Sequence, residues 1–451
     1  MEDDHEENDQ FCGIRYISPE IGKNCEVRYT MSQVKKNGKE DFGKVSLINV
    51  LQINSLDLLG RRFNGYDLNI ALRNDGLSAS QMVVDKFSRD KSVIDLSETI
   101  EKFYILRQHI NRYEYELSMR GMLFPFSRAV EKHNVFQKAD VVHYHLIHNE
   151  VLSLAHFAAL THKKPSLLSI HDCTFLTGHC VYPMDCCRFE IGCGSCPDIK
   201  RQFAIKEDQT ALLWAVKKRV FAEASLELVI GSKWMLDMVK RSPILSHLKT
   251  NYIPFGIDVE FYAKHRENPR KKLGIPQNAF VLFFRAQYVY KGLDHIINAL
   301  ELMSTKPFLI TCAQTGCFDS YAGGYKEFGA VTDDELMAEL YASCDVFLMP
   351  STGESFGFMA IECMASGKPI IVADGTALPG VTFSPEYGIS VPQGDAVALK
   401  YAIEHLRDYP EERNERGCLG QELARKHYRF DDYYRKHKEL YTDIVQRGNS
   451  E

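Results

Sequence analysis

Short apolar runs of strand length alternate along this chain with segments of helix length. A run of about four to eight apolar residues between turn signals is typical of a buried strand, and helical segments between such runs indicate β-α-β units. The pattern therefore predicts an α/β fold with two doubly wound, mostly parallel sheets. The runs lie at 44–51, 140–147, 165–172 and 226–232, and then at 280–287, 307–314, 345–351 and 368–374.

The two series of runs divide the chain near residue 255. Residues 44–255 are expected to form one Rossmann-like domain and residues 256–430 a second. The polar residues 1–43 predict a loosely ordered N-terminal extension, and the pattern of 431–451 predicts a C-terminal helix that packs on one of the domains. Ligands of such sheets bind beyond the carboxyl ends of the strands, so the residues after each run are the candidate site residues.

Composition narrows the class of protein. The chain has 451 residues, of which 45% are hydrophobic and 25% charged, as in ordinary globular proteins. A formal net charge of −6 gives no global basic field, so nucleic acid is not an expected partner. We find neither a secretory signal nor an apolar run of the roughly 18 residues that a membrane-spanning helix needs. These features, together with 13 cysteines, predict a cytoplasmic protein, with contact to the inner membrane surface left open.

Two glutamates lie eight positions apart in the otherwise small or apolar stretch "GESFGFMAIE", Glu354 and Glu362. A helix is expected from about Phe356, which would leave backbone amides of Ser355, Phe356 and Gly357 for an anion or a sugar oxygen. Eight residues correspond to about 12 Å of helix rise, so the two carboxylates cannot share a proton but can bind different parts of an extended ligand. The alternative is that Glu354 is only a helix N-terminal charge and Glu362 a solvated surface residue.

Two cations follow another strand of the same half. Arg285 comes directly after the strand expected within the run 280–287, and Lys291 lies in a turn before the next helix. Arginine can bind phosphate oxygens with two hydrogen bonds, and lysine adds a mobile point charge. Together with the two glutamates, they suit a nucleotide diphosphate joined to a polyol.

These motifs carry a family resemblance. The Glu-x7-Glu pair, Arg285 with Lys291, "SCDVFLMPS" and "MASGKPII" make residues 270–425 similar to the donor domain of retaining glycosyltransferases of family 4. The resemblance implies the GT-B fold, in which two Rossmann-like domains face across a cleft. It also implies a nucleotide diphosphate sugar as donor, a UDP- or GDP-sugar, and no catalytic metal.

The resemblance also implies roles for residues. Arg285 and Lys291 would bind the donor diphosphate, Glu354 the sugar hydroxyls and Glu362 the ribose hydroxyls. Glu354 is expected to act by binding the sugar and not as a nucleophile. The implied mechanism is front-face attack with retention of configuration, with negative charge on the leaving group stabilised electrostatically.

Two further positions concern the donor. Gly329 and Val331, in "EFGAVTDDEL", fall where the family holds the base through backbone contacts. Gly380 stands where the family usually has glutamate, so the contacts of the loop "ADGTALPGV" are not carried over from the family.

The first half resembles the colanic-acid type of transferase, which acts in bacterial exopolysaccharide and capsule assembly. Asn64 and Gly65 lie where the backbone of that family approaches donor phosphate or acceptor. His171 corresponds to a histidine near the reacting sugar and is, with Glu354, a predicted catalytic residue. His145 is a further candidate contact, whereas His143 is expected in the core.

A cysteine-rich loop, 173–197, follows His171. Cys180, Cys186, Cys193 and Cys196 have the spacing C-x5-C-x6-C-x2-C. Thiolates at this density are compatible with a structural zinc ion, which would brace the loop beside His171. Free thiols and, less readily, disulfides remain alternatives.

The sequence thus predicts a retaining hexosyltransferase with a glycan or lipid-linked acceptor, in bacterial surface polysaccharide assembly. Residues 107–128 mix arginines with apolar side chains and could contact an anionic membrane, or form a plain surface helix. The rival functions are a nucleotide-sugar epimerase, a glycan phosphorylase, and a sugar-binding or scaffold protein without turnover.

Overall fold

The computed structural model describes residues 48–148, 150–201, 203–287, 290–313 and 316–448. The chain forms two compact units. One comprises the chain up to Val229 with Val239–Asn251 and the segment from His437 onward, and the other comprises Ile230–Met238 and Tyr252–Lys436. The expected N-terminal extension, 1–43, lies outside the described residues.

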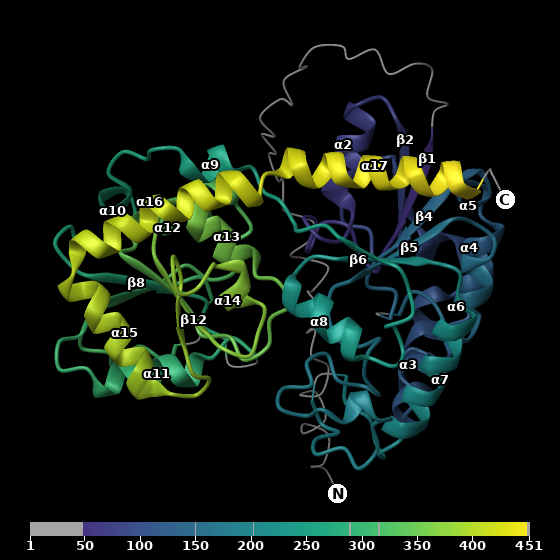
Figure 1. The fold of residues 1–451 in the computed structure, drawn as a ribbon, viewed down its shortest axis with the longest axis horizontal. Helices are drawn as coiled ribbons and strands as arrows, with labels where there is room; N and C mark the ends of the chain where they lie inside the picture. The colour runs from purple at the N-terminus through teal and green to yellow at the C-terminus, as the bar shows by residue number, and fades with distance from the viewer. Residues whose placement is uncertain (1–47, 149, 202, 288–289, 314–315, 449–451) are drawn as a thin grey trace, which may run out of the picture. The chain divides into compact units, whose positions relative to one another are not determined.

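Each unit is built on its own sheet (Figure 1). The first sheet has the strand order β3-β2-β1-β4-β5-β6-β7, and the second has the order β10-β9-β8-β11-β12-β13. Every strand pair with a defined register is parallel. The predicted α/β fold with two doubly wound parallel sheets is therefore confirmed.

The strands of the first sheet are β1 (Asn49–Ile53), β2 (Ser78–Val83), β3 (Val93–Asp95), β4 (Val141–Tyr144), β5 (Ser166–Ile170), β6 (Glu227–Ile230) and β7 (Thr250–Tyr252). Those of the second are β8 (Val281–Phe284), β9 (Phe308–Thr311), β10 (Tyr325–Glu327), β11 (Val346–Met349), β12 (Ile370–Ala373) and β13 (Ile389–Val391).

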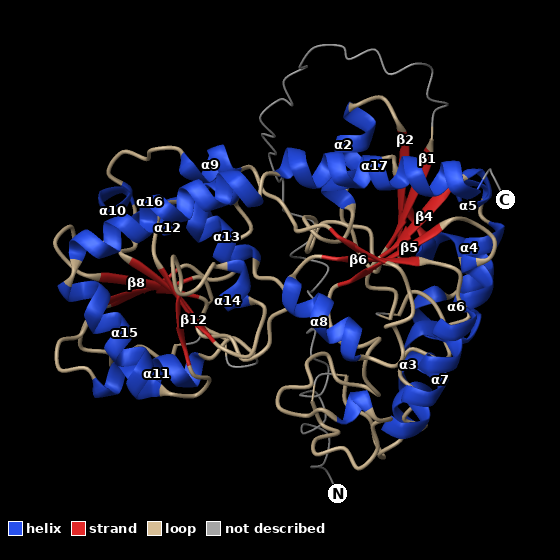
Figure 2. Ribbon diagram, in the orientation of Figure 1, coloured by secondary structure: helices blue, strands red, loops and turns tan. Residues whose placement is uncertain are grey.

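Helices lie on both faces of each sheet (Figure 2). Up to residue 241 they are α2 (Tyr66–Asn74), η1 (Leu96–Thr99), α3 (Phe103–Glu116), α4 (Ser127–Lys132), α5 (Asn134–Lys138), α6 (Leu154–Thr161), η2 (Arg188–Glu190), α7 (Thr210–Glu223) and α8 (Lys233–Arg241). They continue with α9 (Val259–Ala263), α10 (Pro269–Lys272), α11 (Leu293–Leu302), α12 (Asp334–Ser343), α13 (Phe358–Ala365), α14 (Leu378–Val381), α15 (Ala396–Asp408), α16 (Pro410–His427) and α17 (Phe430–Gly448).

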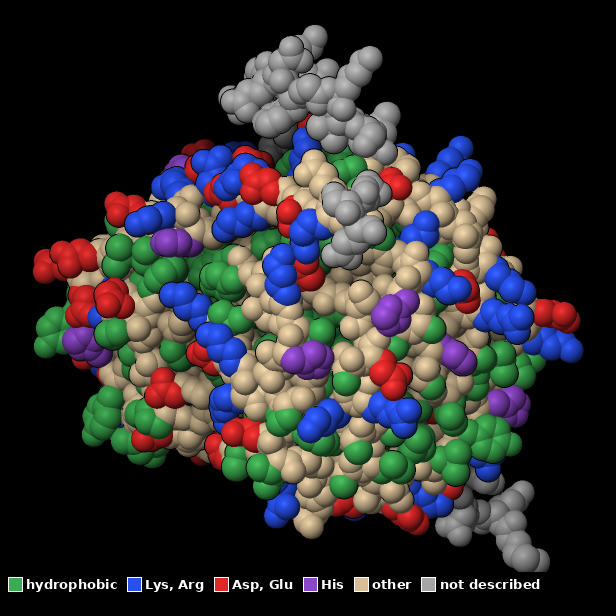
Figure 3. Space-filling model, turned by 45° about the vertical axis from the view of Figure 1, so that its right-hand side comes forward, with side chains coloured by type: hydrophobic (Ala, Val, Ile, Leu, Met, Phe, Trp, Pro, Cys, Tyr) green, Lys and Arg blue, Asp and Glu red, His purple; other side chains and the backbone are tan. Residues whose placement is uncertain are grey.

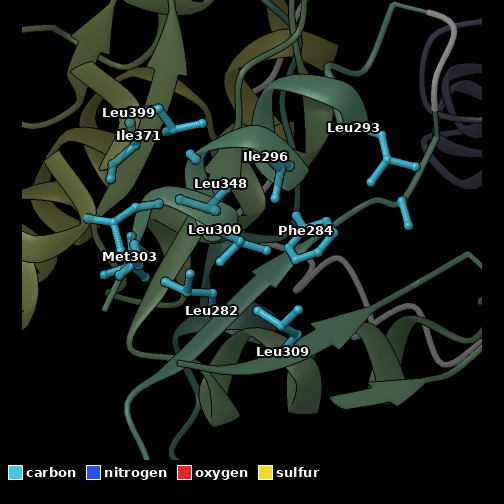
Figure 4. Packing of buried hydrophobic residues seen from close by; sticks show 14 of the residues in the cluster. Leu282, Phe284, Leu293, Ile296, Leu300, Met303, Leu309, Leu348, Ile371 and Leu399 are labelled. Carbon is cyan, nitrogen blue, oxygen red and sulfur yellow. The ribbon is translucent and has the colours of Figure 1, made fainter. Parts of the chain in front are cut away.

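Burial on both faces explains why the strands of the second sheet read as continuous apolar runs. Successive side chains of a strand point to opposite faces. Leu282 and Phe284 of β8 pack with residues of α11 and α15 (Figure 4), whereas Phe283 contacts Tyr341 of α12 and Phe347 of β11. Burial of each such side chain stabilises the folded state by about 1.5–3 kcal/mol.

Each of the eight predicted runs overlaps a strand, whereas five observed strands were not predicted. The missed strands are short or polar: β3, β7, β10 and β13 have three residues each, and β2 reads SASQMV. Four of these five, β3, β7, β10 and β13, are the edge strands of their sheets, and β2 lies next to an edge. An edge strand is open to solvent on one side and needs less apolar cover. Hydrophobic patterning alone does not detect such strands.

The surface carries charges of both signs. Acidic and basic side chains are interspersed on the face seen in Figure 3. Among the described residues, no helix is both long and apolar enough to cross a bilayer.

Candidate functional site

The donor residues predicted from sequence follow two adjacent central strands of the second sheet. From β8 the chain proceeds through β9 and β10 on one side and through β11, β12 and β13 on the other. Phe284 of β8 pairs with Leu348 of β11, so both strands end at the same edge. The boundary between β8 and β11 is the point where the strand order reverses, which is where ligands bind in open α/β sheets. Arg285 and Lys291 follow β8, and Glu354 follows β11.

Lys291 and Glu354 form an ion pair at this point. Lys291 Nζ donates to Glu354 Oε2 at 2.6 Å, and the side chains are 25% and 13% exposed. The two loops are also joined by a hydrogen bond from the Thr352 amide to the Tyr290 carbonyl, at 3.0 Å. At Gly292, whose φ is 74°, an added Cβ would lie 2.1 Å from the Pro350 carbonyl oxygen. The close approach of the backbones thus holds the pair in place.

The segment between Glu354 and α13 differs from the expectation. The helix begins at Phe358, two residues later than predicted, because Gly357 adopts a left-handed conformation with φ 101°. Phe356 is buried and packs against Phe255 and Tyr428, which pulls this residue out of the helix. Ser355, Phe356 and Gly357 therefore form the loop that enters the helix, and the latter two amides find no hydrogen-bond acceptor among the described residues.

Glu362 is not a solvated surface residue. It is 3% exposed, and its Oε2 accepts a hydrogen bond from the Tyr341 hydroxyl at 2.9 Å. The alternative of a plain exposed charge is therefore wrong for this residue. A carboxylate is costly to bury without hydrogen-bonding partners, so Glu362 needs a polar neighbour at its position on α13.

The other donor candidates lie along the same edge of the sheet. Arg285 is exposed directly after β8. Burial raises the pKa of Cys312, after β9, to about 11, and the nearby Arg285 opposes this shift. Gly329, with φ 66°, and Val331 lie half-buried in the loop between β10 and α12. The base contact predicted for these two stays a prediction.

The first sheet brings its candidate residues together in the same way. Its strand order reverses between β1 and β4, and Gly65 and His145 follow these strands. An added Cβ at Gly65, which has φ 89°, would lie 2.7 Å from His145 Nε2 and 2.8 Å from Gln52 Oε1. His171, after β5, stacks on His145 with ring centroids 5.4 Å apart.

A directed chain of hydrogen bonds passes through this cluster. His171 Nε2 lies 3.1 Å from His145 Nδ1, and His145 Nε2 lies 2.7 Å from Gln52 Oε1. Gln52 Nε2 donates at 2.9 Å to the Tyr441 hydroxyl, which lies 2.8 Å from His143 Nδ1. The Gln52 carbonyl oxygen can only accept, so His145 carries its proton on Nε2 and His171 donates from its own Nε2. The Nδ1 atom of neutral His171 is therefore an acceptor.

Sequence reasoning missed Gln52 and Tyr441. Tyr441 lies on α17 and reaches this cluster from the far end of the chain. The available signal was the pair His437 and Tyr441, one helical turn apart on the predicted last helix. His143 is fully buried and bonds to Ser169, which confirms its place in the core.

Asn64 holds the loop after β1. Its Nδ2 donates to the carbonyls of Leu56 and Asp57 at 2.8 and 2.7 Å, and its Oδ1 accepts from the Tyr66 amide at 3.0 Å. The side chain is thus committed to the loop, and a ligand contact at this position would use backbone atoms.

The histidines are neutral near pH 7. Burial lowers the pKa of His143 and His145 well below the ordinary value, and that of His171 to about 4. The unfolded chain takes up a proton on each histidine below about pH 6.5, whereas the folded chain does not until lower pH. Stability from these groups is therefore complete above that pH and falls as the pH drops toward 4.

We expect acidification from pH 7.5 to 5.5 to lower the melting temperature. Below about pH 6.5, each proton that only the unfolded chain binds lowers the free energy of unfolding by about 1.4 kcal/mol per pH unit. Thermal unfolding across this range checks it. His145→Gln should flatten the pH dependence, and His156→Gln, at an exposed position, should leave it unchanged. Equal slopes for all three proteins would contradict the prediction.

The cysteine-rich loop gathers a different ligand set from the one predicted. Candidate ligand atoms of His179, Cys180 and Cys196 lie within 4.8 Å of one another. His179 was not among the four predicted ligands, whereas Cys186 and Cys193 lie outside this group of three. Within the described part of the chain the cysteines are free thiols.

Comparison with known proteins agrees with these observations. Residues 279–408 match the family described as glycosyl transferases group 1. The D-rhamnosyltransferase WbpZ of Pseudomonas aeruginosa is 31% identical over 182 residues, which cover 38% of this chain and 47% of that protein. The putative colanic acid biosynthesis glycosyl transferase WcaC of Escherichia coli is 23% identical over 250 residues, covering 52% and 60%. The chain spans about half the length of the curated relatives it matches.

Solved structures match over most of the chain. Sucrose-phosphate synthase from Thermosynechococcus elongatus superimposes with a TM-score of 0.64 at 17% identity, over 88% of this chain and 99% of that chain. Anabaena HepE in complex with UDP-glucose gives 0.59 at 15% identity, over 88% and 100%. At these identities the likeness establishes the fold. The comparisons thus relate residues 279–408 to the group 1 glycosyl transferases and show that the chain shares the α/β fold of these solved structures.

Proposed function

We propose that this protein is a retaining glycosyltransferase that moves a hexose-type sugar from a nucleotide diphosphate sugar to a glycan or lipid-linked acceptor. The observation that carries the proposal is the Lys291–Glu354 pair at the point where the strand order of the second sheet reverses, with Arg285 directly after β8. This arrangement lies within the residues that match the group 1 family.

The charges suit a leaving nucleotide diphosphate. Arg285 is exposed and Lys291 is partly exposed, so both can reach phosphate oxygens without breaking a buried pair. Their positive charges, with the amides of Phe356 and Gly357, would stabilise the negative charge that develops as the sugar leaves. Glu354 would then accept hydrogen bonds from sugar hydroxyls, and Glu362 would bind the ribose.

The first unit carries residues that are suited to contact with a sugar. His171 is neutral, and its Nδ1 is an acceptor suited to a sugar hydroxyl. Gly65 allows the backbone after β1 to lie close to His145. Both positions follow strands at the carboxyl edge of the sheet, as the proposal requires.

The finer parts of the proposal rest on relatives and on the surface. WcaC is named for colanic acid biosynthesis, and HepE was solved with UDP-glucose, which favours surface polysaccharide assembly and a UDP-sugar. We also propose a cytoplasmic location with membrane contact through α3, where Tyr104, Tyr113 and the following Leu117 are 60%, 61% and 57% exposed. Arg107 would not take part, because it is paired with Asp85 and Glu150.

The test is a screen of UDP- and GDP-sugars by thermal shift, followed by turnover with candidate acceptors, with and without anionic vesicles. A true donor binds the folded state and raises the melting temperature. We expect one nucleotide sugar to stabilise the protein and to be consumed only when an acceptor is present, with the anomeric configuration retained in the product.

Mass spectrometry and NMR of the products separate the rivals. An epimerised nucleotide sugar without acceptor would indicate an epimerase, and a sugar phosphate formed from glycan and phosphate would indicate a phosphorylase. Donor binding without any product would indicate a sugar-binding protein. Each of these results would overturn the transferase.

A further inference from the structure

The loop after His171 brings metal-binding side chains together. His179, Cys180 and Cys196 each offer a ligand atom, and these atoms lie within 4.8 Å of one another. Cys196 Sγ lies 3.5 Å from His179 Nε2. Two thiols and one imidazole at this separation match the donor types that zinc prefers in closed structural sites.

His179 has the environment of a metal-binding histidine. It is 3% exposed, its Nε2 lies 3.2 Å from the Asp198 carbonyl oxygen, and its Nδ1 is buried without a hydrogen-bond partner among the described residues. Histidines that bind zinc commonly donate the N–H of their second ring nitrogen to a carbonyl or carboxylate. A neutral His179 that donates from Nε2 to the Asp198 carbonyl keeps its Nδ1, which has no hydrogen-bond partner among the described residues, for a metal.

Two more thiols lie near the three. Cys193 Sγ accepts a hydrogen bond at 3.3 Å from the amide of Gly178, the residue before His179, and Cys186 belongs to the same loop. Either thiol can complete a set of four ligands.

The buried positive charge of Lys217 is also consistent with a metal site in this loop. Lys217 is 2% exposed, and its Nζ donates to the carbonyls of Thr174, Thr177 and Gly178, at 2.6–2.9 Å. A buried ammonium needs an opposing charge as well as acceptors. Zinc with three thiolates and one neutral histidine carries a net charge of −1, which would supply it.

We propose that the loop 173–197 binds one structural zinc ion through His179, Cys180 and Cys196, with the thiol of Cys186 or Cys193 as the fourth ligand. Binding releases the three thiol protons to solvent. The ion would tie together the two ends of a loop that starts two residues after His171, and it would be distinct from any metal at the donor site.

Metal analysis of the full chain tests the proposal. Protein purified under reducing conditions without chelator should contain one zinc per chain, and exchange for Co²⁺ should give the visible absorption of a tetrahedral thiolate site. Cys196→Ser and His179→Ala should lose most of the zinc. The adjacent Cys187→Ser is the matched control, because Cys187 is exposed and outside the cluster, and it should keep the metal.

Cys186→Ser and Cys193→Ser identify the fourth ligand, and one of the two should lose the metal. Substoichiometric zinc in the wild-type chain would overturn the four-ligand site. So would a loss of zinc in Cys187→Ser equal to that in Cys196→Ser, or full zinc content in both Cys186→Ser and Cys193→Ser. A disulfide found by mass spectrometry of alkylated protein would do the same. The Co²⁺ spectrum of the wild-type chain keeps the test valid if a variant fails to fold, and none of these readouts depends on transferase activity.

Discussion

Replacing Glu354 by glutamine is expected to lower turnover by about 100-fold or more, with little change in stability. The substitution keeps the size of the side chain but removes the charge that holds Lys291 at 2.6 Å and the strong acceptor for a sugar hydroxyl. Losing one preorganised electrostatic contact to the reacting group typically costs about 100- to 1,000-fold in turnover. The ion pair is partly exposed, so its contribution to folding is about 1 kcal/mol or less. Steady-state kinetics with the identified donor, and thermal unfolding, measure both effects.

Glu404→Gln is the matched control for this substitution. Glu404 pairs with Lys400 on α15, in the same unit, and its side chain is 19% exposed. It should lose neither activity nor stability beyond a small amount. Full activity of Glu354→Gln, or an equal loss in both variants, would remove Glu354 from the proposed site.

Replacing Gly65 by alanine is expected to cost at least about 2 kcal/mol of stability and most of the activity. The new Cβ would lie within 2.8 Å of both His145 and Gln52, so their 2.7 Å hydrogen bond must break or shift. A buried hydrogen-bonding group that loses its partner costs about 1–3 kcal/mol, in addition to the strain of a positive φ. Denaturant unfolding and turnover measure the result.

The variant Gly76→Ala separates the cost of backbone strain at a positive φ from the cost of the contacts with His145 and Gln52. Gly76 has φ 85°, close to the 89° of Gly65, but an added Cβ there meets nothing within 4 Å. It should show only the backbone cost of about 1 kcal/mol, with activity unchanged. Similar losses in the two variants would mean that the contacts with His145 and Gln52 contribute nothing.

The sequence predicted the candidate site of the second unit better than the candidate site of the first unit. The central strands of the second sheet are buried on both faces, so they appear as continuous apolar runs, and the residues after them carry charge. Glu354, Lys291 and Arg285 could thus be placed at one edge from strand positions alone. The ion pair itself could not be predicted, because it depends on the backbone approach between Gly292 and Pro350.

The histidine cluster shows the opposite case. His145 and His171 follow strands and were found, but their protonation is set by Gln52, a polar residue inside an apolar strand, and by Tyr441, almost 300 residues away from His143. No local pattern relates residues so distant in sequence. The start of α13 was misplaced for a related reason, since Phe356 is drawn into an aromatic cluster with residues of other elements.

The last helix has a consequence for how the protein is made. The segment from His437 onward belongs to the unit that is otherwise built from the first half of the chain, and Tyr441 bonds both Gln52 and His143 there. Chains emerge from the ribosome from the N-terminus, and domains generally fold in that order. Here the first sheet can form early, but Gln52 and His143 in its buried polar centre lack a hydroxyl partner until Tyr441 has been synthesised. The second unit is thus translated entirely before the first can be completed, which makes the order of synthesis differ from the order in which the two units mature.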